Sequence, residues 1–263
     1  MIKKRIIFAL LYQDGYFYLS RNFQLQKVGD LNWLIDNFGF GSTANHIDEL
    51  ICLLVKKEPT KEHKKNFFED INKLRKKIFI PITLGGGIRS LNDVADYFYN
   101  GADKVLLNTS IFKKNLTKEI SKLYGEQSIS IMVDYKISKN NKDQIFVNSG
   151  TKFKMNLSDF FTKMNNLNFG EIILNSIEND GTGTGLDLRI LKKIPKKWKK
   201  RPILLMGGAG KSDHIIEGLK KDLISGIVTA NLFNFLGAGL QQARKKSKKY
   251  RINLANFDTK IIL

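Results

Sequence analysis

A long internal repeat is the feature that most restricts the folds open to this chain. The segment PITLGGG at 81–87 aligns with PILLMGG at 202–208, an offset of 202 − 81 = 121 residues. The same offset carries NTSIF at 108–112 onto TANLF at 229–233, and two more strand-like runs repeat at nearly the same spacing. A period this long predicts a duplicated half-domain rather than a solenoid, whose period is about 20–50 residues.

Eight short apolar runs alternate with amphipathic segments along the chain. They are largely apolar on both faces, as parallel strands covered by helices are, and they span Arg5–Leu11, Glu49–Val55, Ile80–Leu84, Lys104–Leu107, Ser128–Asp134, Glu171–Ser176, Pro202–Met206 and Gly226–Ala230. Helices are expected at Phe67–Lys77, Leu91–Asn100, Leu116–Leu123, Leu157–Leu167 and His214–Lys220. This alternation predicts the α/β class and one (β/α)8 TIM barrel over residues 1–263, with half-barrels at about 1–123 and 124–263.

Composition restricts the partners and the surroundings of the chain. Lys and Arg total 44 against 25 Asp and Glu, a net charge of +19, but the Lys runs at 192–201 and 244–251 each hold one aromatic residue, Trp198 or Tyr250, and not the series of aromatic residues that stacks on successive bases. Nucleic acid is therefore not predicted as a partner, and no apolar stretch is long enough to predict a membrane span. The single Cys52 favours a reduced, cytoplasmic setting. The three scattered histidines predict no metal, and no cofactor is expected.

The carboxyl ends of the strands, where a TIM barrel places its active site, carry glycines and small polar residues in both halves. Glycine lets a phosphate approach backbone N–H groups, and small polar residues donate further hydrogen bonds. Each half therefore predicts one phosphate cradle, and two cradles predict a substrate with two phosphates. Tight turns alone are the alternative, but the matching positions favour cradles formed by Gly86, Gly87, Asn108 and Thr109 and by Gly207, Gly208, Ala230 and Asn231.

Charged residues stand at both ends of the predicted strands. Asp134 ends the fifth strand, where it is a candidate general acid or base with a pKa raised by desolvation, the alternative being a structural cap. At the opposite ends, Arg5, Glu49, Lys104 and Glu171 start strands one, two, four and six. They predict a ring of ion pairs across the barrel bottom. Stability is one role for it, but buried ion pairs stabilise poorly, so a gate fits better.

Several motifs are specific when taken together: KRII at the start, IDEL at 47–50, IPITLGGGIRS at 80–90, GADKV at 101–105, GEIIL at 170–174 and GGAGK at 207–211. Through them the chain resembles, over essentially its full length, the cyclase subunit of imidazole glycerol phosphate synthase. The resemblance implies a glutaminase docked on the bottom face as a heterodimer, with ammonia passing a gate of Arg5, Glu49, Lys104 and Glu171. It also places Asp180, Gly181 and Thr182 at a phosphate site, and Asp103 and Gln127 on the partner face.

The resemblance fails at part of the catalytic site. One of the family's two catalytic carboxylates is Asp134, but Leu11 stands at the other, Leu19 replaces a loop lysine, Leu54 a third carboxylate and Met206 a serine. Because losing one of two acid/base groups costs about 10²–10⁴ in rate, a good histidine-pathway cyclase is not expected.

Three functions remain open for such a chain. The first is a lyase- or amidotransferase-type synthase subunit with an altered site. The resemblance implies that such a member of the family would supply ammonia for amidation or amidine formation on a sugar precursor of a surface glycan such as lipopolysaccharide. The second is a genuine imidazole glycerol phosphate synthase cyclase of histidine biosynthesis. The third is a non-catalytic scaffold that binds a phosphorylated ligand. The excess positive charge, which none of these motifs needs, is interpreted as a surface property that favours an acidic partner.

Overall fold

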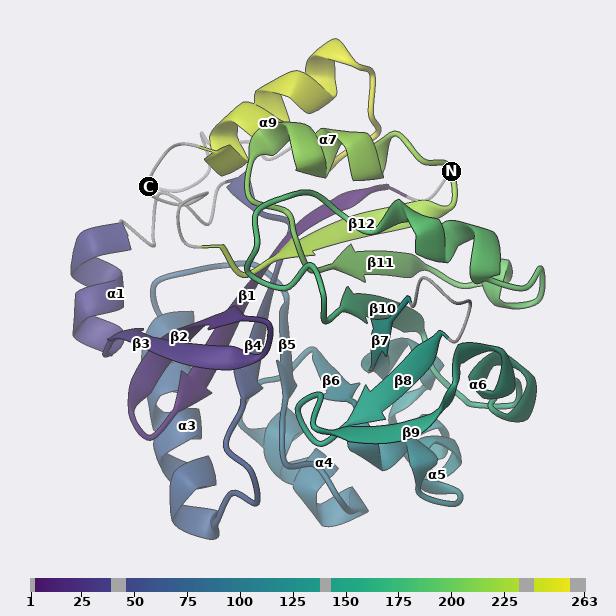
Figure 1. Ribbon diagram of the computed structural model, residues 1–263. Coiled ribbons are helices and arrows are strands. Elements are labelled where there is room, and N and C mark those ends of the chain that lie inside the picture. Colours follow the sequence, from purple (N-terminus) through teal and green to yellow (C-terminus); the bar gives the residue numbers. More distant parts are fainter. Residues whose placement is uncertain (1–2, 39–45, 138–142, 232–238, 256–263) are drawn as a thin grey trace.

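Eight parallel strands close into a barrel in the computed structural model, which describes residues 3–38, 46–137, 143–231 and 239–255 (Figure 1). In ring order they are β1 (Arg5–Gln13), β4 (Glu49–Leu54), β5 (Ile82–Gly85), β6 (Lys104–Leu107), β7 (Ile129–Lys136), β10 (Glu171–Ser176), β11 (Ile203–Met206) and β12 (Ile224–Thr229). β12 pairs with β1, and β7 with β10, so the ring has no open edge. The predicted TIM-barrel class is confirmed.

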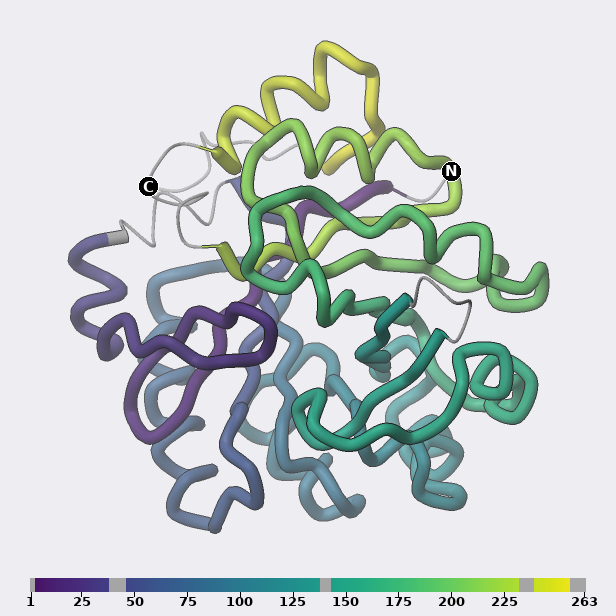
Figure 2. Tube along the Cα trace, viewed as in Figure 1, coloured from purple at the N-terminus to yellow at the C-terminus, as the bar shows by residue number. Residues whose placement is uncertain are grey.

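Helices cover the outside of the barrel, as the course of the chain in Figure 2 shows. They are α1 (Leu31–Phe38), α3 (Lys61–Arg75), α4 (Leu91–Tyr99), α5 (Leu116–Tyr124), α6 (Leu157–Lys163), α7 (Ser212–Leu219) and α9 (Gly239–Lys249), with 3-10 turns η2 (Thr109–Phe112), η3 (Glu126–Ser128), η4 (Leu188–Lys193) and η5 (Trp198–Lys200). α3 begins six residues before its predicted start because Thr60 caps it, accepting a hydrogen bond from the His63 amide. No helix within the described ranges is long and apolar enough to cross a membrane.

Each half of the chain adds a β-hairpin after its first barrel strand, a feature that the apolar runs do not predict. β2 (Tyr16–Arg21) and β3 (Gln24–Gly29) follow β1, whereas β8 (Gln144–Val147) and β9 (Lys152–Asn156) follow β7. Asp14 and Gly15 make the turn between β1 and β2 with φ of 51° and 80°. Asp-Gly is a preferred pair for such a turn, so this dipeptide is the sequence signal for the first hairpin.

Side chains alternate between two hydrophobic clusters. The outer cluster lies between strands and helices and takes Ile6, Phe8, Leu10 and Tyr12 from β1. The inner cluster takes Ile7, Ala9 and Leu11 from the same strand, and it joins residues of strands that are not neighbours in the ring. Only the barrel lumen brings those strands together, so the inner cluster fills the lumen.

Candidate functional site

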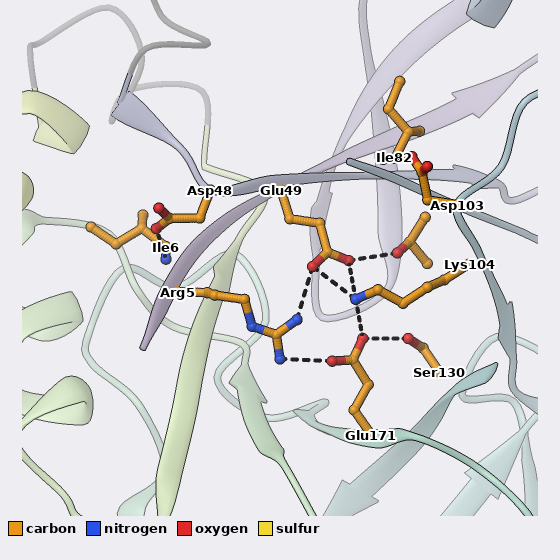
Figure 3. A network of polar contacts seen from close by, with 10 residues as sticks. Arg5, Ile6, Asp48, Glu49, Ile82, Asp103, Lys104, Ser130 and Glu171 are labelled. Carbon is orange, nitrogen blue, oxygen red and sulfur yellow. Dashed lines mark hydrogen bonds and ion pairs between the residues drawn. The ribbon is translucent and has the colours of Figure 1, made fainter. Parts of the chain in front are cut away.

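The four predicted gate residues form a closed ring of ion pairs at the end of the barrel where the strands begin (Figure 3). Arg5 contacts Glu49 at 2.9 Å and Glu171 at 2.7 Å, and Lys104 Nζ lies 2.8 Å from a carboxylate oxygen of each acid. The Thr83 hydroxyl donates to Glu49 at 2.6 Å, and the Ser130 hydroxyl donates to Glu171. Two cations thus balance two anions, and every carboxylate binds both cations.

Burial and charge act against each other in this ring, which we call the gate ring (Arg5, Glu49, Lys104 and Glu171). Burial alone would raise the pKa of Glu171, but Arg5 and Lys104 outweigh it and hold the pKa well below its ordinary value. Burial likewise opposes the charge on Arg5, and the two carboxylates reverse that effect and raise its pKa. Arg5 and Glu171 are therefore both held in their charged forms, and the formal charges of the two basic and two acidic side chains of the ring cancel.

An apolar layer separates the gate ring from the opposite end of the lumen. Ile7, Ile51, Leu106 and Ile173 each follow a ring residue by two positions and belong to the inner cluster. Two positions further on, β7 and β10 present Asp134 and Asn175, so polar groups return about 13 Å from the ring at the ordinary rise of a strand. The lumen is thus polar at both ends and apolar between them.

Asp134 is buried at the far end of the lumen and is held by two amide side chains. Asn175 Nδ2 donates to one carboxylate oxygen at 2.9 Å, and Asn108 Nδ2 donates to the other at 2.9 Å. Burial raises the pKa of Asp134 to about 6, although the two amides oppose this. Asn175, which the sequence argument did not select, has a buried Oδ1 atom without a hydrogen-bond partner within the described residues.

Asp134 is expected to titrate near pH 6, inside the range useful for proton transfer at neutral pH. Carboxyl ¹³C shifts measured against pH should show this step in the unchanged chain and lose it in Asp134→Asn. Asn175→Leu removes a donor to the ionised form and should raise the pKa further. A carboxyl group at this position that titrates below pH 5 would contradict the environment described.

The two predicted cradles share one backbone geometry. Gly86 and Gly207 both have positive φ, at 101° and 97°. A Cβ on Gly86 would lie 2.0 Å from the carbonyl oxygen of Leu54, and one on Gly207 would lie 2.6 Å from that of Ser176. Leu54 and Ser176 end β4 and β10, so the same close approach recurs after equivalent strands.

A pocket of about 220 Å³ opens beside the second cradle. Six of the predicted phosphate-binding residues line it, namely Asp180, Gly181, Gly207, Gly208, Ala230 and Asn231. Arg21, from the first hairpin, adds a cation to the lining, and Leu19 adds an apolar side chain. Thr182 lies in the same loop as Asp180, where its hydroxyl donates to the carbonyl of Asn179 at 2.9 Å.

The first cradle is built differently in detail. The Asn108 amide is directed to Asp134 and to the Met132 carbonyl rather than toward Gly86 and Gly87. The Thr109 hydroxyl accepts from the Asn148 amide at 3.2 Å, at the tip of the second hairpin. The structure therefore links the first cradle to both Asp134 and the β8–β9 hairpin.

The two hairpin tips meet over the mouth of the barrel. Asp180 accepts hydrogen bonds from the Ser20 hydroxyl and from the Phe23 amide (2.9 Å), and burial raises its pKa. Phe23 has φ of 63°, uncommon for a large side chain. A Cβ on Gly150 would lie 2.2 Å from the Phe23 ring, so the tip of the β8–β9 hairpin packs on Phe23. Asp180 thus stabilises the tip of the β2–β3 hairpin through two hydrogen bonds.

The four departures from the family pattern fall in three places. Leu11 and Met206 belong to the inner cluster, so they add apolar side chains to the end of the lumen that also holds Asp134. Leu19 lines the pocket beside the second cradle. Leu54 is different, because it belongs to the outer cluster while its neighbour Leu53 faces the lumen. Leu54, predicted to stand in place of a carboxylate of the site, therefore faces the helices and not the lumen.

The predicted partner-face residues lie exposed beside the gate ring. Asp103 precedes Lys104 and accepts the Ile82 amide at 2.7 Å, and Gln127 lies just before β7. Three large apolar side chains that the sequence argument missed occupy the same arc: Phe79, Tyr99 and Leu123, which are 101%, 91% and 65% exposed. They precede β5, β6 and β7, at the end where the strands begin. We call these three residues the apolar sector.

Fold and site together define a duplicated (β/α)8 barrel with a charged ring at one end and a buried carboxylate beside glycine-rich turns at the other. The profile of the family described as histidine biosynthesis protein matches residues 43–237. The chain belongs to that family.

Curated relatives agree with this assignment. A protein of Parasynechococcus marenigrum (strain WH8102), provisionally named imidazole glycerol phosphate synthase subunit hisF2, is 42% identical over 260 residues, covering 98% of this chain and 95% of the relative. Imidazole glycerol phosphate synthase subunit HisF of Bacillus cereus (strain G9842) is 31% identical over 257 residues, covering 97% and 99%. The subunit of the same name from Clostridium botulinum (strain 657 / Type Ba4) is 31% identical over 254 residues, covering 95% and 97%.

Proposed function

We propose that this chain is the ammonia-accepting barrel subunit of a glutaminase complex and that the reaction at its mouth is altered. One observation carries the proposal: a neutral gate ring opens into an apolar lumen layer that leads to Asp134. Ammonia is small and uncharged, so it crosses an apolar layer at far lower cost than an ammonium ion, whose charge would lose its hydration.

The altered reaction follows from the groups around Asp134. Cyclisation with bond cleavage needs one group that gives a proton and another that takes one, whereas Leu11 and Met206 do neither. A single carboxylate with a pKa near 6 suits a simpler transfer of ammonia. The acceptor that the family resemblance favours is a sugar precursor of a surface glycan, which would become amidated or gain an amidine. The pocket beside Gly207 and Gly208 would hold its phosphate.

Glutamine and a purified glutaminase subunit test this function directly. The expected result is a stable complex in which the barrel stimulates glutamine hydrolysis, while the histidine-pathway substrate with ammonium salt reacts far below ordinary enzymatic rates of about 1–10³ s⁻¹. Turnover of that substrate at an ordinary enzymatic rate would contradict the proposal that the reaction is altered.

A genuine cyclase of histidine biosynthesis is the second candidate. It is favoured by the 31% identity to HisF subunits and by the equivalent geometry of the two glycine turns. The ammonium-salt assay separates the two, because a genuine cyclase turns over without a glutaminase. If no glutaminase binds and no substrate reacts, the remaining candidate function is a non-catalytic scaffold that binds a phosphorylated ligand.

A further inference from the structure

The end of the barrel that carries the gate ring divides into two arcs of different chemistry. The apolar sector lies where the chain enters β5, β6 and β7. On the opposite arc, exposed lysines enter β11 and β12, namely Lys196, Lys197, Lys199, Lys200, Lys220 and Lys221. We call these six residues the basic rim.

The basic rim continues onto the neighbouring segments of the same arc. Lys4, just before β1, donates to the Lys221 carbonyl at 2.8 Å and so ties the start of β1 to the rim. Lys248, Lys249 and Arg251 lie exposed around the end of α9, beside Tyr250. Within residues 194–202, 220–223 and 248–255, all of which the structure describes, Asp222 is the single acidic residue. These three segments thus hold ten basic residues against one acidic residue, while the opposite arc carries the exposed Lys76, Lys77 and Lys122 beside the apolar sector.

We propose that the glutaminase docks on this face through an acidic surface that meets the basic rim, with an apolar patch of the glutaminase covering the apolar sector. The inference rests on the proposed glutaminase partnership and adds the charge of the partner's docking surface. Lysines around a neutral ring repel cations in solution but attract an acidic protein surface over a distance comparable to the Debye length.

A protein fits this face better than a nucleic acid does. Trp198, inside the basic run, is buried against Phe161 and Phe169, so it presents no ring to a base. The Tyr250 ring is covered by Lys220 Nζ at 3.3 Å. Within the described residues the most exposed aromatic side chains are Phe79 and Tyr99, which lie on the opposite arc and with Leu123 suit an apolar protein contact.

The test measures binding of the purified glutaminase subunit from the same organism to the full chain between 50 and 300 mM NaCl. The unchanged chain is expected to lose about tenfold or more in affinity across this range, mainly through a slower association rate. The quadruple change Lys196→Gln, Lys197→Gln, Lys199→Gln and Lys200→Gln should remove most of that salt dependence. The matched control changes four lysines at the other end of the barrel, Lys113, Lys114, Lys152 and Lys154, to Gln and should keep it.

Each outcome is decisive. The inference is supported if the rim variant loses the salt dependence of binding while the unchanged chain and the control variant keep it. In that case Tyr99→Ser should speed dissociation of the glutaminase without changing the salt dependence. Binding of the rim variant that equals the unchanged chain at every salt overturns the charged docking surface but leaves the glutaminase partnership standing. Failure of every chain to bind glutaminase overturns the proposed function and the inference with it. Tighter, rim-dependent binding of a 20-bp DNA duplex would assign the rim to nucleic acid instead.

Discussion

Replacement of Lys104 with methionine is expected to lower the free energy of unfolding by about 3–5 kcal/mol at pH 7, the usual cost of removing one partner from a buried ion pair. Methionine keeps the length of the stem, so the change removes charge rather than volume. Glu49 and Glu171 are almost fully buried, and in this variant they would share only Arg5. One of the two carboxylates is then expected to take up a proton. Urea unfolding with pH-stat measurement of proton uptake checks both results.

The dependence on pH distinguishes loss of the ring from general damage. The pKa of Glu171 is lower in the folded chain than in the unfolded chain. Ionised Glu171 therefore adds to the free energy of unfolding at any pH above its unfolded pKa, and this stabilisation is lost as pH falls through its folded pKa. The deficit of Lys104→Met should therefore shrink toward acid pH. Lys104→Arg should stay close to the unchanged chain, and Lys122→Met, on the exposed end of α5, should change stability little. A deficit that is the same at pH 3 and pH 7 would contradict this account.

Leu11→Asp is expected to raise cyclase turnover by about 10²–10⁴ with ammonium salt and the histidine-pathway substrate, because it supplies the missing second acid/base group. Leu11 faces the lumen near the top of β1 and is nearly buried. A second carboxylate there would interact with Asp134 across the lumen, and the pKa values of the two groups should separate, as a general acid and a general base require. Single-turnover kinetics at pH 6–8 measures the gain.

Two control variants separate chemistry from a general increase in polarity. Leu11→Asn has nearly the same shape but does not ionise, so it should give no comparable gain. Leu53→Asp places a carboxylate on the neighbouring strand, directly paired with position 11, and should also fail if position matters. Absence of any gain in Leu11→Asp, with the fold intact, would mean that the departure from the cyclase site extends beyond this residue.

Much of the barrel can be predicted because its strands have strong local patterns. All eight apolar runs coincide with barrel strands to within one or two residues at most ends, and the offset of 121 places Gly86 and Gly207 in equivalent turns. The gate ring follows from the same pattern, since Arg5, Glu49, Lys104 and Glu171 all begin strands in phase with lumen residues.

The remaining features depend on contacts that no local pattern records. At the end of β4 both Leu53 and Leu54 are apolar, and only the direction of the strand decides that Leu53 faces the lumen. The hydrogen bond from Asn175 to Asp134 joins two residues that are 41 positions apart in the chain. The apolar sector has no signal in the sequence either, because Phe79, Tyr99 and Leu123 belong to three separate segments that only the barrel brings to one arc.

The contact between the two hairpin tips has a thermodynamic consequence. Phe23 packs at Gly150, Asp180 holds the Phe23 amide, and Thr109 accepts the Asn148 amide, so each hairpin is attached to a different cradle and to the other hairpin. A ligand that orders the tip of one hairpin therefore reduces the conformational entropy that is lost when the tip of the other hairpin becomes ordered. By thermodynamic linkage, a ligand at the second hairpin has the same effect on binding at the first. Occupation of one cradle is therefore expected to strengthen ligand binding at the other cradle.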